Sequence, residues 1–301
     1  MNIADLIGHT PLVSLEPLAA PKGARVFAKA EFLNPSGSVK DRAAKAMIQA
    51  GLDLGLYGPD KILIDATSGN TGVAYAMIGA ALGRQVTLYM PGNANFERKA
   101  LIKAYGAKIV DTDPLEGSDG AYTAVKNESE KNPEKYFFPN QYNNPANPLA
   151  HYKTTGPEIW EQTEGKITHF INSLGTSGTF VGTARFLKEK NLSVKTYIVQ
   201  PDSPFHGIEG TKHMASTIKP DIYDLTLVDG EEKVSTNEAI AVAKRLAREV
   251  GLLVGVSSGA NVAAALRLAK SLDPAATVVT ILGDTGARYL SEGIWGDSPE
   301  S

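Results

Sequence analysis

Short runs of β-branched residues alternate with alanine-rich segments along most of the chain, and this alternation limits the fold more than any other feature. The runs with strand character lie at 61–65, 85–90, 108–111, 167–173, 195–200 and 277–282. The segments with helical character lie at 73–82, 96–105, 118–131, 179–190, 235–249 and 258–272. Repeated strand–loop–helix units are typical of α/β proteins with largely parallel sheets, because a parallel crossover needs a connecting helix.

The composition narrows the classes of function. A net charge of −3 over 301 residues provides no general attraction to nucleic acid or to an anionic membrane surface. The chain has no cysteine, which excludes disulfides and thiolate nucleophiles, and its five scattered histidines do not indicate a metal site. No apolar run approaches the length of a membrane span, and residues 1–10 lack the form of a signal peptide. We therefore expect a cytoplasmic protein that binds neither nucleic acid nor a membrane.

Two loops rich in glycine and hydroxyl side chains each follow an expected strand and open an expected helix. The first reads ATSGNTG at 66–72, and the second reads SLGTSGT at 173–179. Backbone N–H groups at such a helix start bind anions, and glycine lets the backbone approach a ligand closely. The second loop has neither the dinucleotide pattern G-x-G-x-x-G nor the lysine of a Walker loop. A carboxylate or a phosphate suits the first loop, and a monophosphate suits the second.

A third stretch, GVSSGAN at 255–261, opens the expected helix at 258–272. Taken alone, it predicts that Ser257 or Ser258 is the N-cap of that helix, because a serine side chain accepts hydrogen bonds from first-turn N–H groups. For the helix at 235–249, Ser235 and Glu238 have the spacing of a capping box.

The stretch NPSGSVKDR at 34–42 places Lys40 at the expected start of an alanine-rich helix. The helix dipole is positive at that end and disfavours an ammonium group, and burial would also lower the pKa of the lysine. A lysine that is a usable amine can form a Schiff base with a carbonyl. Together with a monophosphate cradle, such a lysine indicates a cofactor that carries an aldehyde and a phosphate, namely pyridoxal 5′-phosphate.

In their order along the chain, NPSGSVKDR, TSGNTG, GTSGT and GVSSGA resemble the motifs of the fold type II (β-family) pyridoxal-phosphate enzymes. Within that family, IGHTPLV at 7–13, ERKALIKAYGA at 97–107 and NNPANPLAHYKTTGPEIW at 143–160 resemble the cysteine synthases, in particular those of the B type. The resemblance extends from about residue 7 to residue 296 and covers nearly the whole chain.

This resemblance implies an α/β fold of the tryptophan synthase β type, with two lobes that each hold a largely parallel twisted sheet flanked by helices. The N-terminal lobe is expected to comprise 1–10 and 35–144 and to carry Lys40 and the TSGNTG loop. The C-terminal lobe is expected to comprise 11–34 and 145–301 and to carry the phosphate loop and Ser257. Independently of the resemblance, the proline-rich stretch FFPNQYNNPANP at 137–148 is expected to connect the two halves.

The resemblance also implies roles for individual residues. Lys40 matches the lysine that holds the cofactor as an internal aldimine, Asn70 matches the residue that bonds the ring hydroxyl oxygen, and Ser257 matches the serine that faces the pyridine nitrogen. The residues that match the phosphate loop are Gly175, Thr176, Ser177, Gly178 and Thr179. The residues that match the site for the α-carboxylate of the substrate are Thr67, Ser68, Thr71 and Gln141.

The expected activity is that of a cysteine synthase, which replaces the acetate of O-acetyl-L-serine by sulfide through an aminoacrylate and yields L-cysteine. A neutral serine opposite the ring nitrogen makes a weaker electron sink than a carboxylate would, which suits β-elimination. The loop at 67–71 would orient the Cα–H bond, and Lys40 would take up and return the Cα proton.

Several alternatives stay open at this stage. Related enzymes with an arginine near the position of Lys212 accept phosphorylated serine, so O-phosphoserine is the second candidate donor, with Lys212 as a point charge. Sulfide or another sulfur donor could be the acceptor. Other fold type II enzymes, such as cystathionine β-synthase, serine dehydratase or a diaminopropionate-forming synthase, are further candidates. A cofactor-free scaffold is disfavoured by the retention of Lys40, Asn70 and the phosphate loop together. A homodimer is expected from the family, and no metal is expected from the composition.

Overall fold

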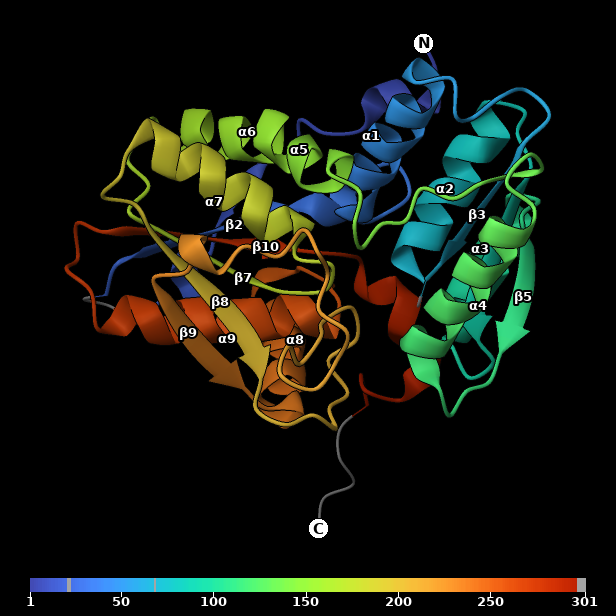
Figure 1. Ribbon diagram of the computed structural model, residues 1–301. Coiled ribbons are helices and arrows are strands. Elements are labelled where there is room, and N and C mark those ends of the chain that lie inside the picture. The colour runs from blue at the N-terminus through green and yellow to red at the C-terminus, as the bar shows by residue number, and fades with distance from the viewer. Residues whose placement is uncertain (21–22, 68, 297–301) are drawn as a thin grey trace.

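Two sheets organise the protein, whose computed structural model describes residues 1–20, 23–67 and 69–296 (Figure 1). The larger sheet has six strands in the order β1-β2-β10-β7-β8-β9, and the smaller has four in the order β5-β4-β3-β6. Their bounds are β1 Leu12–Ser14, β2 Arg25–Ala30, β3 Ile62–Ala66, β4 Val86–Pro91, β5 Lys108–Thr112, β6 Tyr136–Phe137, β7 His169–Ser173, β8 Lys195–Pro201, β9 Gly230–Val234 and β10 Thr277–Leu282. In the described part of the chain, every strand pairing is parallel except that of β1 with β2. The expected α/β class with largely parallel sheets is confirmed.

Helices flank both sheets. Their bounds are α1 Lys40–Asp53, α2 Asn70–Ala81, α3 Phe96–Ala104, α4 Gly117–Lys131, α5 Ala146–Lys153, α6 Thr155–Gln162, α7 Gly178–Lys190, α8 Thr236–Val250 and α9 Val256–Lys270. Short 3₁₀ helices are η1 Ile3–Leu6, η2 Glu16–Leu18, η3 Glu31–Leu33, η4 Leu225–Leu227 and η5 Gly286–Glu292. The strands and helices expected from the alternating pattern are present, with ends shifted by at most three residues. None of the helices described is both long and apolar enough to cross a bilayer.

The central strand β10 shows how the larger sheet is covered on both faces. Val278 and Leu282 of β10 belong to a core cluster with residues of α8 and α9, whereas Val279 and Ile281 belong to a second cluster with residues of α6 and α7. Successive side chains of a strand point to opposite faces, so a strand buried on both faces reads as a continuous apolar run. In Figure 1, α5, α6 and α7 accordingly lie on one side of this sheet and α8 and α9 on the other.

The smaller sheet is covered in the same way. Leu63 of β3 and Leu88 of β4 lie in a core cluster with residues of α1 and α2, while Ile64 of β3 packs with Ala121 and Val125 of α4. The strands of this sheet come from residues 62–137, whereas β1 and β2, from residues 12–30, join the larger sheet beside β10. This distribution supports the two-lobe division expected from the sequence, and we keep its boundaries as a proposal.

The arrangement of the sheets determines where a ligand can bind. Thr67 follows β3, the loop 174–177 follows β7, and Gly283 and Asp284 follow β10. In parallel sheets the carboxyl ends of the strands face the same crevice, and helices begin there with unpaired N–H groups. The three loops therefore converge on the space between the two sheets, next to the start of α1.

Candidate active site

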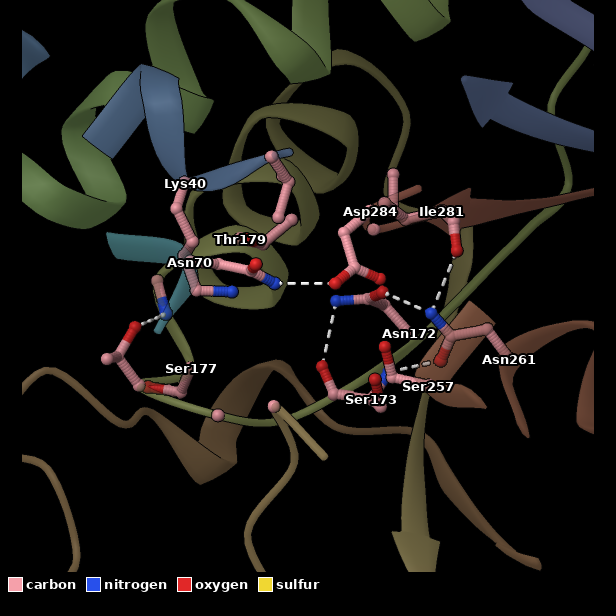
Figure 2. A pocket seen from close by; sticks show the side chains of 16 residues that line it. Lys40, Asn70, Asn172, Ser173, Ser177, Thr179, Ser257, Asn261, Ile281 and Asp284 are labelled. Atoms are coloured by element: carbon pink, nitrogen blue, oxygen red, sulfur yellow. Dashed lines mark hydrogen bonds between the residues drawn. The ribbon is translucent and has the colours of Figure 1, made fainter. Parts of the chain in front are cut away.

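A pocket of about 510 Å³ lies where these loops meet (Figure 2). The residues expected from the sequence to bind the cofactor all line it, namely Lys40, Asn70, Gly175, Thr176, Ser177, Gly178, Thr179 and Ser257. Residues that the sequence analysis did not single out also line it, among them Asn172, Ser173, Asn261 and Asp284. The tertiary structure thus brings together segments that lie more than 200 residues apart.

The turn between β7 and α7 has the features of a cradle for a phosphate group. Ser177 adopts a left-handed conformation with φ of 72°, and its buried Oγ has no hydrogen-bond partner in the described part of the protein. A Cβ at Gly178 would overlap the side chain of Asn147, and a Cβ at Gly175 would lie 2.5 Å from the carbonyl oxygen of Gly210. The loop therefore tolerates no side chain at these two glycines, and it presents first-turn N–H groups and a free hydroxyl. These features fit a phosphate monoester.

Two neighbouring residues hold the hydroxyl groups of the cradle in place. Asn147 Nδ2 donates to Thr176 Oγ1 over 3.0 Å and to the carbonyl oxygen of Gln141 over 2.7 Å. His151 Nε2 lies 3.2 Å from Thr179 Oγ1, and its Nδ1 lies 2.9 Å from Thr155 Oγ1. Burial, assisted by nearby cations, lowers the pKa of His151 well below its usual value. A neutral imidazole therefore orients the Thr179 hydroxyl.

Lys40 is the first residue of α1, as the sequence predicted, and its half-buried side chain lines the pocket. Burial lowers the pKa of Lys40 below its usual value, and the positive charges of Arg98 and Arg288 act in the same direction. The carboxylate of Asp284 opposes them and raises it. The net lowering of the pKa favours a neutral amine at Lys40, as expected from the sequence.

The loop before α1 is held by the residue that follows Lys40. Asp41 is buried, and its Oδ2 accepts a hydrogen bond of 2.7 Å from the backbone N–H of Ser36. The side chain of Ser36 also donates to Asp41. These bonds fold the turn Asn34–Val39 back onto the first turn of α1 and so fix the position of the Lys40 backbone.

The prediction that Ser257 or Ser258 caps α9 is wrong. The helix begins at Val256, and its N-cap is Gly255. A Cβ at position 255 would overlap the carboxylate of Asp284, so only glycine fits there. Ser258 Oγ instead accepts a hydrogen bond of 2.9 Å from the N–H of Gly283, and Ser257 lines the pocket. Contacts with the end of β10 therefore displaced the helix start that the serines indicated locally.

Asp284 connects both sides of the pocket, and sequence reasoning did not find it. Its Oδ2 accepts hydrogen bonds of 2.7 Å from Asn70 Nδ2 and from the hydroxyl of Tyr289, while its buried Oδ1 has no partner among the described residues. Arg288 donates to Asn70 Oδ1, which fixes the orientation of the amide. The available signal was Asp284 in the run GDTGA directly after the β-branched strand TVVTIL, at the edge of the sheet where ligands bind.

A second pocket of about 550 Å³ adjoins the first, and Lys40, Asn70, Gly175, Thr176 and Gly210 line both. Four of the five residues expected to contact the substrate line it, namely Thr67, Thr71, Gln141 and Lys212. Ser68 lies outside the described residues. The other lining residues are Arg98, Ser118, Tyr142 and Thr211.

The residues expected to bind the α-carboxylate form a connected group at the start of α2. Thr71 Oγ1 donates to Gln141 Oε1 over 2.9 Å, and Gln141 Nε2 donates to the carbonyl oxygen of Ala66 over 2.6 Å. Thr67 Oγ1 accepts hydrogen bonds from the N–H groups of Gly69 and Gly72 over 3.0 and 3.2 Å. A pocket wall of hydroxyl groups at a helix N-terminus suits a carboxylate.

A buried acid supports this wall from behind. Asp65 is fully buried at the end of β3, accepts a hydrogen bond of 2.9 Å from the hydroxyl of Tyr75, and accepts a longer one of 3.4 Å from the N–H of Gln141. Burial raises the pKa of Asp65 to about 7. Within the described ranges, no group of three or more histidine, aspartate and glutamate side chains is placed to hold a metal ion.

Comparisons with known proteins agree with this geometry. The sequence profile of the family described as "Pyridoxal-phosphate dependent enzyme" matches residues 3–284. The chain is 48% identical to a cysteine synthase of Aquifex aeolicus, over 98% of this chain and 92% of that protein. It is 44% identical to cysteine synthase B of Salmonella typhimurium, over 98% and 96% of the two chains.

A solved structure extends the agreement to three dimensions. The crystal structure of a cysteine synthase from Entamoeba histolytica matches with a TM-score of 0.93 and 35% sequence identity, and the match covers 100% of this chain and 92% of that one. A family match over nearly the whole chain coincides with the pocket that holds Lys40 and the phosphate cradle. The chain therefore belongs to the pyridoxal-phosphate dependent enzymes, in the group of the cysteine synthases.

Proposed function

We propose that this protein synthesises L-cysteine by replacing the acetate group of O-acetyl-L-serine with sulfide. The observation that carries the proposal is that two pockets meet at Lys40. One is lined by the phosphate cradle and Ser257, and the other by Thr67, Thr71 and Gln141. A cofactor held in the first pocket would present its reactive carbon at Lys40, next to an amino acid held in the second.

The residues of the first pocket suit pyridoxal phosphate. The cradle from Gly175 to Thr179 would bind the phosphate, Asn70 would bond the ring hydroxyl oxygen, and Ser257 would face the ring nitrogen. When bound, the cofactor supplies an electron-withdrawing ring that acidifies the Cα–H bond of an amino acid attached to it. Ser257 has no charge to hold the ring nitrogen protonated, which supports elimination from Cβ over reactions that need a long-lived carbanion.

Lys40 would hold the cofactor through its Nζ and then act on the substrate. Its lowered pKa, caused mainly by burial, supports a neutral amine that can accept a proton from Cα. Its Nζ, once free, would lie beside Cα of an amino acid held in the second pocket. Because Lys40 lines both pockets, it can take up the proton without a movement of α1.

The substrate would be oriented by its α-carboxylate. Thr67, Thr71 and Gln141 lie around the start of α2, where the helix dipole favours an anion. Holding the carboxylate fixes the direction of the Cα–H bond toward Lys40, and such positioning contributes to the rate. The β-substituent of the bound amino acid must then point into the remainder of the pocket, which Arg98, Tyr142, Thr211 and Lys212 line.

Lys40 and the two substrates account for every bond and every proton of the overall reaction. The Cα–H bond breaks and its proton passes to Lys40 Nζ, and the Cβ–O bond breaks so that acetate leaves with the electron pair. Sulfide then forms a bond to Cβ, and Lys40 returns the proton to Cα. No oxidation or reduction occurs.

Absorbance and product formation test the proposal. The purified protein is expected to bind pyridoxal phosphate and absorb visible light, and to convert O-acetylserine and sulfide to cysteine. Lys40→Ala is expected to abolish both properties. Lys45→Ala is the matched control on the same helix, because Lys45 donates to the carbonyl oxygen of Ala4 and lies away from the pocket.

Substrate comparison separates the proposed reaction from those of related enzymes. Turnover is measured with O-acetylserine and sulfide, and separately with serine and homocysteine and with serine alone. Preference for serine would overturn the proposed substrate but not the family. A wild-type protein that remains colourless with pyridoxal phosphate would overturn the proposal altogether.

Two further features of the proposal rest on the family resemblance alone. We infer a homodimer and a cytoplasmic location. Analytical ultracentrifugation of the holoenzyme would test the first, and cell fractionation would test the second.

A further inference from the structure

Lys212 lies in the wall of the pocket to which we assign the amino-acid substrate. It belongs to the loop that follows β8, and its backbone N–H donates to the carbonyl oxygen of Leu174 over 2.6 Å. This bond fixes Lys212 beside the phosphate cradle. Its side chain is only 12% exposed. An ammonium group at this place is available to meet the β-substituent of a bound amino acid.

Asp119, in the first turn of α4, pairs with this ammonium and lines a neighbouring hollow together with Lys212. Asp119 Oδ1 lies 3.2 Å from Lys212 Nζ, and Asp119 Oδ2 accepts a hydrogen bond of 3.4 Å from the N–H of Ile218. Lys212 Nζ also lies 3.4 Å from the carbonyl oxygen of Ile218 and 4.7 Å from the centre of the Tyr142 ring. The carboxylate thus binds both the lysine and the loop that carries it.

The guanidinium of Arg98, the other cation in this wall, is paired as well. Arg98 binds Glu209 and the hydroxyl of Tyr289, and its Nη2 lies 3.8 Å from Asp284 Oδ2. Apart from Lys40, the cations in the described lining of the pocket are therefore Arg98 and Lys212, each with a carboxylate partner. A phosphate dianion that enters must displace Asp119 from Lys212 or lie near its negative charge. An acetyl ester is uncharged, so it neither has to displace Asp119 nor is repelled by the negative charge of Asp119.

We propose that Asp119 determines donor specificity: by pairing with Lys212, it makes the pocket select O-acetylserine over O-phosphoserine. This inference rests on the proposed function, because it concerns the leaving group of the same reaction. Asp119 touches no reacting atom in this arrangement and acts through Lys212. Removal of its charge leaves an unpaired ammonium that can bind a phosphate ester.

Four forms of the holoenzyme test the inference: the wild type, Asp119→Asn, Asp221→Asn, and Asp119→Asn combined with Lys212→Met. Asp221 is the matched control, because it is an exposed carboxylate that lines the neighbouring hollow of about 320 Å³ together with Asp119 and Lys212. Its replacement changes the net charge equally without removing the partner of Lys212. For each form, kcat/KM is measured with O-acetylserine and with O-phosphoserine, at one sulfide concentration.

The expected result is a change in the ratio of the two kcat/KM values. In Asp119→Asn the ratio of O-phosphoserine to O-acetylserine rises about fivefold, the size of effect that one partly buried ion pair provides. The change lies mainly in KM for O-phosphoserine, because the ammonium meets the phosphate before and during the reaction. The ratio stays at the wild-type value in Asp221→Asn and returns to it when Lys212→Met is added.

Any of three results would overturn the inference: an unchanged ratio in Asp119→Asn, an equal rise in Asp221→Asn, or a rise that persists in the double variant. The visible absorption of the bound cofactor verifies that each form is folded. Inorganic phosphate provides a readout that does not depend on turnover. Its affinity for the holoenzyme, measured by calorimetry, is expected to rise in Asp119→Asn alone.

This second readout separates the two proposals. If the wild type does not turn over O-acetylserine, the proposed function fails, while the phosphate titration still tests whether Asp119 masks Lys212. If the wild type makes cysteine from O-acetylserine but phosphate binds all forms equally, the proposed function stands and the role of Asp119 is wrong.

Discussion

Asn70 and Asp284 are joined by a hydrogen bond of 2.7 Å from Nδ2 to Oδ2, which links the first residue of α2 to the end of β10. α2 follows β3 of the smaller sheet, whereas β10 belongs to the larger sheet, so the bond crosses the crevice between the two sheets at the pocket. Arg288 binds the other end of the Asn70 amide. The side chain expected to contact the cofactor ring is thus oriented by two residues that follow β10.

The same carboxylate influences Lys40, and this leads to a pH prediction. Asp284 raises the pKa of Lys40, whereas burial, Arg98 and Arg288 lower it. Asp284→Asn removes the one opposing charge, so the pKa of Lys40 falls further. Covalent attachment of the cofactor needs the neutral amine. The pH at which the apoprotein regains visible absorption on mixing with pyridoxal phosphate is therefore expected to shift downward.

Glu209→Gln is the control for this shift, because Glu209 binds Arg98 and is not placed beside Lys40. It is expected to move the profile less than Asp284→Asn does. A profile that stays in place, or moves to higher pH, in Asp284→Asn would contradict the electrostatic role of Asp284.

Ser177 provides a prediction about the phosphate cradle. Its buried Oγ has no partner among the described residues, so Ser177→Ala removes a group that the protein itself leaves unsatisfied. We expect the apoprotein to keep its free energy of unfolding, while the affinity for pyridoxal phosphate falls about fivefold, as the loss of a hydrogen bond worth roughly 1 kcal/mol predicts. Fluorescence titration measures the affinity, and urea denaturation measures the stability.

Ser193→Ala, at an exposed position, is the control and should change neither quantity. If Ser177→Ala destabilised the apoprotein by more than about 1 kcal/mol, its hydroxyl would have a protein partner and the cradle argument would lose its main support.

A buried ion cluster on the side of α1 away from the pocket predicts a loss of stability. Arg42 Nε lies 2.7 Å from Glu31 Oε2, and Arg42 Nη1 lies 2.7 Å from Glu158 Oε1. Lys29 Nζ lies 2.6 Å from Glu158 Oε2. Arg42→Met leaves buried carboxylates without their main partner, so a destabilisation of about 3–5 kcal/mol is expected. Arg245→Met, which breaks an exposed pair on α8, should cost no more than about 0.5 kcal/mol.

The pH dependence of this loss has a definite sign. Burial alone would raise the pKa of Glu158, but Arg42 and Lys29 outweigh it and lower the pKa to about 2, from an ordinary value of 4.5. Stability from this group is therefore present above about pH 4.5 and is lost as the pH falls toward 2. The difference in unfolding free energy between the wild type and Arg42→Met should shrink over that interval. A constant difference would show that Arg42 acts through packing alone.

Much of the site could be predicted from the sequence because its central parts are contiguous. Lys40 stands at a helix start that its own neighbours define, and the loop from Gly175 to Thr179 carries its glycines and hydroxyl groups in one contiguous stretch. Strand–loop–helix order follows from local periodicity, so the α/β class and most element positions were also accessible. The strands β1, β2, β6 and β9 were not predicted, since they are short or carry charged residues.

The tertiary structure alone decided which distant side chains meet. Asn70 contacts Asp284 although the two are 214 positions apart in the sequence, and Lys212 contacts Asp119 at a separation of 93 positions. Both contacts form because the order of strands in the two sheets brings the strand ends to one crevice. Local patterns do not encode that order. The wrong prediction of Ser257 or Ser258 as the N-cap of α9 has the same cause. The contact of Gly255 with Asp284 outweighed the local preference of serine for the N-cap position. The sequence by itself determined the chemistry available at each loop, and packing between the sheets determined how those groups are paired.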